Sequence, residues 1–232
     1  MTAVYVTATG TDIGKTFVTA GLIRHFRAAG RAVDAIKPVV SGFDPAAWQD
    51  SDPAALLAAL EHPLVMEEVE RISPWRFKAP LSPHMAARQE GRAIGYQEVV
   101  DFCRRAMAAR RGVLLIEGVG GIMVPLDDRH TVLDWMTLLR IPIVLVAGTY
   151  VGTMSHTLTA LEVLVRRNLD VAAVIISESE GSAASLADTV ATVERFAASI
   201  DVVGLPRLAP DAGDHPAERK PDDTRWLSGE LR

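Results

Sequence analysis

The tripeptide Gly14-Lys15-Thr16 carries the strongest chemical signal in the sequence. It follows an apolar run at residues 3–8 and opens an amphipathic run at residues 17–26. A glycine-containing loop between a strand and a helix directs backbone N–H groups and the positive helix end at an anion. The lysine of such a loop bridges phosphate oxygens, and the next hydroxyl coordinates Mg²⁺. An ordinary turn with Gly14 as a spacer is the alternative, but the position after the first strand favours a nucleotide-binding loop.

Two acidic residues and a second lysine could complete a phosphate site. Glu117 ends an apolar run and precedes a glycine-rich loop, where a carboxylate can bind the hard Mg²⁺ ion. Asp52 could serve the same metal or cap a helix before Pro53, and the residues alone leave that choice open. Lys37 ends a second apolar run, so its charge should face the same sheet edge as Lys15 and help to neutralise a phosphate. Alternatively, Glu117 and Lys37 could be ordinary solvent-exposed charges at strand ends, without a role in binding.

The elements around these residues predict an α/β fold with a doubly wound, mostly parallel sheet and helices on both faces, of the P-loop NTPase type. Apolar runs that alternate with helical patterns are typical of such a sheet, and ligands bind at the carboxyl ends of its strands. The strand-like runs are 3–8, 33–39, 113–116, 143–147, 171–176 and 202–205. The helical patterns are 15–29, 96–110, 156–168 and 185–199.

Charge and composition narrow the possible functions. Lysine and arginine number 24 against 29 aspartate and glutamate residues, so the formal net charge is −5, which disfavours a basic nucleic-acid binder. Local groups must therefore hold any anionic ligand. Cys103 is the only cysteine, which fits a reducing cytoplasm. No apolar run approaches the roughly 20 residues that span a membrane, and residues 1–10 indicate a strand instead of an export signal.

The chain divides into three stretches by composition. We expect a single α/β domain over residues 1–210. Within it, residues 43–91 are rich in proline and weakly periodic, and we expect them to form an elaborated region over the site. Residues 211–232 are polar and contain proline, and we expect a weakly ordered tail there.

The sequence resembles the dethiobiotin synthetases of biotin biosynthesis at motifs spread over most of the chain. The blocks Lys37-Pro38-Val39-Val40-Ser41-Gly42 and Ser82-Pro83-His84 are specific to that family and foreign to generic P-loop proteins. The other matching blocks are residues 9–16, 51–52, 74–77, 80–81, 89–92, 117–121, 134–135 and 204–206.

The resemblance implies an ATP- and Mg²⁺-dependent cyclo-ligase that joins CO₂ to 7,8-diaminopelargonic acid, giving dethiobiotin, ADP and phosphate. The reaction would pass through a carbamate and a carbamic-phosphoric anhydride. It needs no protein nucleophile, so catalysis would consist of positioning and charge stabilisation. The implied enzyme is a cytoplasmic homodimer with its site at the interface, and it binds neither nucleic acid nor membrane.

The resemblance also implies the site residues. The metal ligands would be Thr16, Asp52 and Glu117, and the catalytic residues Lys15, Lys37, Thr11 and Ser41. The nucleotide-binding residues would be Asp12, Ile13, Gly14, Lys15, Thr16, Phe17, Glu117, Gly118, Gly120, Ser177, Glu178, Gly204, Leu205 and Pro206. The loop for the substrate carboxylate would be Thr149, Tyr150, Val151, Gly152, Thr153, Met154 and Ser155, whose alternative role is an ordinary helix start.

The chain departs from the family pattern at three places. The family loop begins Gly-Thr-Asp-Thr, whereas residues 8–11 read Ala-Thr-Gly-Thr, and we expect Gly10 to supply the backbone freedom. Ser177-Glu178 stands where relatives often carry Asn-Asp to read adenine. Because an amide both donates and accepts, we predict looser nucleotide selectivity. Ser155 replaces an amide in the carboxylate loop.

A partition-type P-loop ATPase, or another nucleotide-binding regulatory module, is the alternative function. Partition-type proteins carry an additional lysine early in the phosphate loop, where this chain has Gly10. They also carry a basic amphipathic tail, which this sequence lacks. We expect His84 and His156 to pack or form hydrogen bonds instead of exchanging protons with a substrate.

Overall fold

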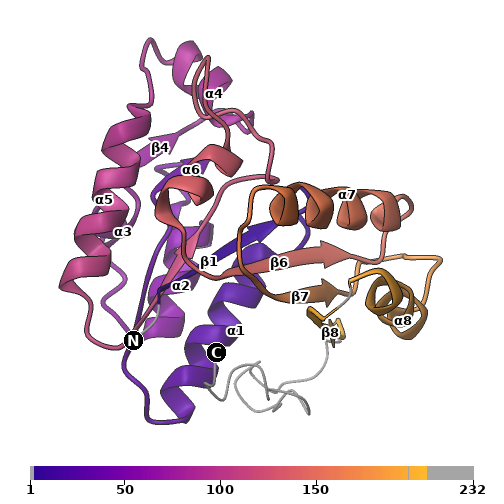
Figure 1. Cartoon of the computed structure of the whole chain (residues 1–232). Helices are drawn as coiled ribbons and strands as arrows, with labels where there is room; N and C mark the ends of the chain where they lie inside the picture. Colours follow the sequence, from indigo (N-terminus) through magenta and orange to yellow (C-terminus); the bar gives the residue numbers. More distant parts are fainter. Residues whose placement is uncertain (1–2, 198, 208–232) are drawn as a thin grey trace.

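The computed structural model describes residues 3–197 and 199–207 (Figure 1). The expected tail over residues 211–232 lies outside these described residues. The main sheet contains β1 (Ala3–Ala8), β2 (Val33–Ile36), β5 (Val113–Glu117), β6 (Ile143–Gly148), β7 (Val171–Ser177) and β8 (Asp201–Leu205). The strands are all parallel and lie in the order β2-β5-β1-β6-β7-β8. The predicted parallel α/β sheet is therefore confirmed.

The central strands are apolar on both faces because helices cover both sides of the sheet. All five residues of β5 are buried. Tyr5 of β1 packs edge-on against the ring of Trp135 at 5.1 Å between ring centroids, and both side chains are fully buried. The register pairs Val6 with Glu117, so the loops after β1 and β5 leave the sheet at one edge. That edge is where a doubly wound sheet binds ligands.

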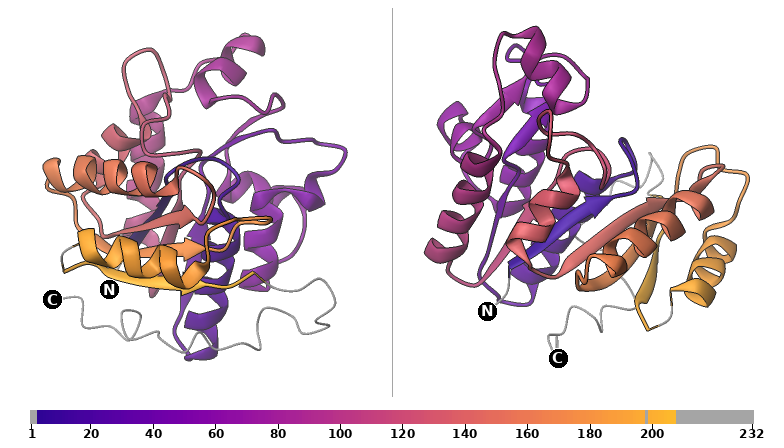
Figure 2. Two further views of the ribbon diagram at one scale, coloured as in Figure 1. Left: turned by 90° about the vertical axis from the view of Figure 1, so that its right-hand side faces the viewer. Right: turned by 45° about the horizontal axis from the view of Figure 1, so that its top comes forward.

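Helices α1 (Lys15–Ala28) and α2 (Asp52–Leu60) pack together on one face of the sheet. Helices α5 (Tyr96–Ala109), α6 (Val132–Leu139), α7 (Thr153–Arg166) and α8 (Leu186–Phe196) lie on the other (Figure 2). This division follows from the right-handed connection between parallel strands, which places α1 opposite the later helices. In the described part of the chain, no helix is long and apolar enough to cross a membrane.

The apolar run at residues 33–39 is not one strand, as expected, but two. Its first part is β2, and its second part begins β3 (Val39–Ser41), which pairs with β4 (Trp75–Phe77) in a separate two-stranded sheet. The break falls at Lys37 and Pro38. Proline has no N–H for the ladder, and the Lys37 N–H donates to the Ile72 carbonyl at 3.1 Å instead of to a strand of the main sheet.

Residues 43–91 form a series of short elements, of which α2 packs against α1 and β2 on one face of the sheet. They comprise a 3₁₀ turn (Trp48–Asp50), α2, α3 (Met66–Ile72), β4 and α4 (Pro83–Gln89). Pro53 and Pro83 lie in the first turns of α2 and α4, where a missing N–H costs nothing. The proline-rich composition therefore marks helix starts, and not only loops.

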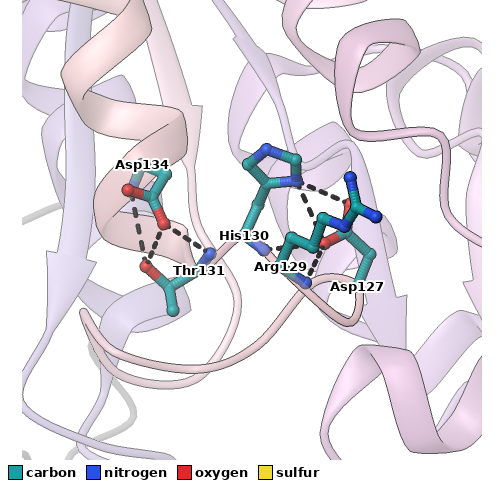
Figure 3. Close-up of polar contacts among 5 residues, drawn as sticks. All are labelled: Asp127, Arg129, His130, Thr131 and Asp134. Atoms are coloured by element: carbon teal, nitrogen blue, oxygen red, sulfur yellow. Dashed lines mark hydrogen bonds and ion pairs between the residues drawn. The ribbon is translucent and has the colours of Figure 1, made fainter.

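Helix α6 was not among the predicted helices, although a local signal for it exists. Thr131 accepts the Asp134 N–H, and the Asp134 carboxylate accepts the Thr131 N–H, which forms a capping box (Figure 3). Just before it, the Asp127 carboxylate accepts the N–H groups of Arg129 and His130. These contacts fix the end of the loop that runs from β5 to α6.

Candidate functional site

The phosphate loop, residues 8–16, joins β1 to α1. Gly14 has φ of 90°, and a Cβ atom there would lie 2.8 Å from Ser177 Oγ, so both its conformation and its surroundings require glycine. Asp12 is also left-handed, with φ of 58°. Gly14 is the N-cap of α1, and no side chain caps that helix, so its first N–H groups are left for a ligand.

Lys15 begins α1 and is almost completely buried. Its Nζ donates to the Gly10 carbonyl at 3.4 Å, and none of the described carboxylates forms an ion pair with it. Burial, with the nearby Lys37 charge adding to it, lowers the pKa of Lys15 to about 8. The ammonium is therefore held in a position that an anionic ligand would stabilise.

Lys37 connects two carboxylates at the end of β2. Its Nζ lies 2.6 Å from Glu117 Oε1 and 2.5 Å from Asp52 Oδ2. The Thr16 hydroxyl donates to the same Glu117 Oε1 at 2.7 Å. The structure thus gathers four predicted residues that stand far apart in the sequence. Asp52 is the first residue of α2 and faces this group, but the N-cap of that helix is Ser51, so the interpretation of Asp52 as the helix cap is wrong.

The charges in this group stabilise one another. Burial acts against the Lys37 ammonium, but the Glu117 and Asp52 carboxylates outweigh it and raise the pKa of Lys37. Burial likewise acts against the Asp52 carboxylate, but Lys37 and the Thr16 hydrogen bond lower its pKa overall. A buried ion pair of this kind is costly to break, because the remaining charge is left without a partner.

The donor set fits a Mg²⁺ ion. Glu117 is fully buried, and its Oε2 atom accepts no hydrogen bond among the described residues, so one carboxylate oxygen lacks a partner. No cluster of three or more histidine, cysteine, aspartate or glutamate side chains that could hold a metal occurs among the described residues, so a metal here would need other ligands as well. Two carboxylates and one hydroxyl suit Mg²⁺, which keeps several waters or phosphate oxygens as ligands.

A first cavity of about 740 Å³ opens in front of these residues. Its lining includes the predicted residues Thr11, Asp12, Gly14, Lys15, Thr16, Phe17, Lys37, Ser41, Asp52 and Gly120. Glu117 lies behind it, and Gly118 packs against Tyr5, where a Cβ atom would lie 2.8 Å from the hydroxyl. The lining also includes Val40, Val119, Val124 and residues 80–83, which were not among the predicted site residues. The Ser-Pro-His block at residues 82–84 was the available signal for that wall.

A second cavity of about 570 Å³ adjoins the first and shares Asp12, Gly14 and Phe17 with it. The predicted residues Ile13, Ser177, Glu178 and Pro206 also line it, whereas Gly204 and Leu205 do not. The lining contains three residues that were not predicted, Ser179, Glu180 and Arg207. The Arg207 N–H donates to Glu178 Oε2 at 2.9 Å, which holds that carboxylate at the cavity.

The predicted carboxylate loop, residues 149–155, leads from β6 into α7. None of its residues is among those that line the two cavities. Thr149 is buried and exchanges hydrogen bonds with Ser179, and the Thr153 hydroxyl donates to the Gly148 carbonyl. The Tyr150 hydroxyl lies 3.3 Å from the Thr9 hydroxyl and 2.9 Å from His156 Nδ1. The loop therefore lies beside the phosphate loop, while Val151 projects into solvent at 89% exposure.

Known proteins resemble the chain along most of its length. A family model described as an AAA domain matches residues 2–209. An ATP-dependent dethiobiotin synthetase of Acidiphilium cryptum is 50% identical over 78% of this chain and 81% of its own. The enzyme of the same name from Caulobacter vibrioides is 46% identical over 92% of this chain and 96% of its own. The one from Methylobacterium nodulans is 44% identical over 94% of this chain and 97% of its own.

One solved structure supports the fold alone. The MinC:MinD cell division complex of Aquifex aeolicus contains a chain that aligns with a TM-score of 0.54 at 12% identity, over 90% of this chain and 82% of that chain. The relatives above share far more sequence, and their matches cover at least 78% of this chain and at least 81% of their own. On these similarities, the chain belongs to the family of ATP-dependent dethiobiotin synthetases.

Proposed function

We propose that the protein carboxylates 7,8-diaminopelargonic acid with CO₂ and closes the ureido ring, giving dethiobiotin, ADP and phosphate. Membership of the family makes it an ATP-dependent ligase of biotin biosynthesis. The observation that carries the finer proposal is the position of Lys15 and Lys37 beside one cavity, next to the phosphate loop. Two cations at this point suit a reaction in which a carbamate oxygen attacks a phosphoryl group.

The proposed steps need no covalent bond to the protein. One substrate amine attacks CO₂ to form a carbamate, and a carbamate oxygen then attacks the γ-phosphorus of ATP to form a carbamic-phosphoric anhydride and ADP. The second amine attacks the carbonyl carbon and phosphate leaves. Lys15 would hold the phosphoryl oxygens, and Lys37 would stabilise the carbamate. Thr11 and Ser41, both in the lining of the first cavity, would orient the substrate.

Thr16, Asp52 and Glu117 are the residues that would hold Mg²⁺. When bound, the ion would neutralise negative charge on the terminal phosphates. Glu117 supports this role best, because its Oε2 atom is buried without a partner among the described residues. The second cavity would receive the nucleotide base, with Ser177 and Glu178 at its edge.

The carboxylate loop supports a homodimer in which the site is completed by a second copy of the chain. Its residues do not line the cavities of their own chain, yet no side chain caps α7, and N–H groups of its first turn after Thr153 suit a carboxylate. The exposed Val151 would lie in such an interface. We also propose that the enzyme is cytoplasmic, which fits its use of ATP and its one free thiol, Cys103. We propose no nucleic-acid or membrane partner, and the net charge of −5 disfavours the former.

A coupled assay of ADP release tests the function. With Mg²⁺, bicarbonate and ATP, we expect turnover to depend on diaminopelargonic acid and dethiobiotin to appear in equal amount with ADP. A regulatory or partition-type ATPase would instead hydrolyse ATP at the same rate with or without that substrate. Folded protein that binds ATP but shows no stimulation would reject the synthetase.

A further inference from the structure

The ammonium group of Lys37 contacts two of the three groups that would hold the metal. It contacts Asp52 Oδ2 at 2.5 Å and Glu117 Oε1 at 2.6 Å, and Thr16 donates to that same Oε1 atom at 2.7 Å. We propose that Lys37 is an internal counter-cation that occupies the metal position in the free enzyme, so that a divalent ion must displace it. This inference rests on the proposed function, in which Thr16, Asp52 and Glu117 are metal ligands.

The two cations exclude each other for geometric and electrostatic reasons. Magnesium–oxygen distances are about 2.0–2.1 Å, only slightly shorter than the contacts of the Lys37 ammonium, so both cations need the same space between the two carboxylates. Like charges a few ångströms apart in a buried site also repel strongly. Lys15 adds a third positive charge at the same cavity. Two carboxylates cannot balance both lysines and a divalent ion within this space.

The arrangement explains how the fold tolerates two carboxylates beside each other without metal. The Glu117 side chain is completely buried, and the Asp52 side chain is about half exposed. Buried carboxylates are costly unless a cation pairs with them. Lys37 supplies that cation from within the chain, so the site can form before any ligand arrives.

A displaced Lys37 side chain can move into the first cavity, which it borders. Its backbone is fixed, because its N–H donates to the Ile72 carbonyl and Pro38 follows it. The side chain, in contrast, is long and flexible, and it borders the first cavity together with Lys15 and Ser41. Displacement therefore brings the ammonium into the space where the proposed substrate lies. Binding of the metal would therefore also bring the Lys37 ammonium to the substrate.

Lys15 provides a matched control. It is buried beside the same cavity and carries the same charge, but its ammonium donates to the Gly10 carbonyl at 3.4 Å, and none of the described carboxylates pairs with it. Removing Lys15 lowers the general repulsion of a cation without vacating the position between the carboxylates. Only Lys37 should compete directly with the metal.

The first experiment measures Mn²⁺ binding to the nucleotide-free full chain by the loss of the aqueous Mn²⁺ signal in electron paramagnetic resonance. We expect Lys37→Met to bind Mn²⁺ at least about tenfold more tightly than the wild type, because its carboxylates have lost their cation. Lys15→Met should change the affinity several times less. Adding Glu117→Gln to Lys37→Met should abolish the gain. Equal affinity in Lys37→Met and the wild type would overturn the proposal.

The second experiment uses the wild type and so does not depend on how a variant folds. Lysines are reductively methylated with and without saturating Mn²⁺, and the labelling of each is followed by mass spectrometry. Displacement predicts that Mn²⁺ accelerates the labelling of Lys37 several-fold more than that of Lys15. Unchanged or slower labelling of Lys37 would contradict the proposal. Neither experiment contains diaminopelargonic acid, so displacement seen in an enzyme inactive on that substrate would reject the proposed function alone.

Discussion

The two adjoining cavities are built in opposite ways. The first has buried charges at its base, with Lys15, Lys37 and Glu117 all less than a tenth exposed. The second is bordered by exposed polar groups at the end of the described chain, such as the ion pair of Arg207 with Glu180. Buried charges depend on each other, whereas an exposed pair contributes between zero and about 1 kcal/mol to stability.

This difference indicates where the chain can change without losing its chemistry. At the first cavity, each charge balances another, so a single replacement leaves a buried group unpaired. At the second cavity, solvent supports the polar groups when a partner is lost. Ser177-Glu178, where the chain departs from the family pattern, lines this second cavity. Substitutions at the two cavities should therefore have effects of very different size.

Replacing either lysine of the first cavity should have the greatest effect. We expect Lys15→Ala and Lys37→Ala each to lower turnover at least about 100-fold, because each ammonium stabilises charge that develops on transferring oxygens. The coupled ADP assay with diaminopelargonic acid measures this. The control at the second cavity, Arg207→Ala, should remain within a few-fold of the wild type. Comparable losses in all three variants would remove the contrast between the cavities.

Gly14 borders both cavities, and its replacement should weaken nucleotide binding as a whole. Gly14→Ala forces a left-handed residue, at about 1–2 kcal/mol, and places a Cβ atom 2.8 Å from Ser177 Oγ. We expect at least about a tenfold loss of ATP affinity by titration calorimetry. The control is Gly21→Ala in α1, where a Cβ atom would meet nothing within 4 Å. Equal affinity in both variants would show that the loop tolerates a side chain.

The pH dependence should report on Lys15. Burial lowers the pKa of this lysine to about 8, so its charge is present below pH 8 and is lost as the pH rises through that value. We expect kcat/KM, which reflects groups of the free enzyme, to fall above about pH 8. The fall should move to higher pH in Lys15→Arg, since a guanidinium keeps its proton. A profile that stays level to pH 9.5 would contradict this assignment.

Base selectivity should change only modestly. We expect the wild type to favour ATP over CTP and GTP by a small factor, and Ser177→Asn, which restores the family's amide, to increase that preference about fivefold, as one additional hydrogen bond would. Steady-state kinetics with the three nucleotides measures the ratio. Turnover at saturating ATP should remain unchanged, because the substitution lies at the second cavity. A wild type that already rejects CTP and GTP strongly would contradict the predicted low nucleotide selectivity.

Stability should respond least to the exposed pair. Arg207→Ala removes the contact with Glu180, in which both side chains are more than half exposed, and we expect the free energy of unfolding to change by less than about 1 kcal/mol. Urea denaturation measures this. Lys37→Met, which leaves buried carboxylates unpaired, is the comparison and should destabilise more. The reverse order would mean that burial does not govern these interactions.

Local patterns in the sequence predicted most of the elements that position the site. The strand at residues 3–8, the glycine-lysine-threonine turn and the acidic end of β5 all follow from hydrophobic pattern and residue type. Parallel strands then place Lys15, Lys37 and Glu117 at one edge. Two local errors have local causes, since Pro38 divides the run at residues 33–39 and the capping box at Thr131 was not recognised as a helix start.

The contacts between distant residues could not be predicted in this way. Asp52 had two open interpretations, and only the packing of α2 against α1 and β2 brings its carboxylate to Lys37. The same holds for residues 80–83 over the first cavity and for Arg207 at the second, because these positions depend on how remote segments fold together.

Local features of the sequence are enough to predict which chemical groups the protein has and which edge of the sheet presents them, because strand period and loop type are local properties. Which of these charges meet depends on the tertiary structure. It pairs Lys37 with Glu117 and Asp52 and leaves Lys15 beside the open cavity, and these distances depend on packing between elements. Two lysines of the same type thereby acquire different surroundings, because burial and neighbouring charge set the behaviour of an ionisable group.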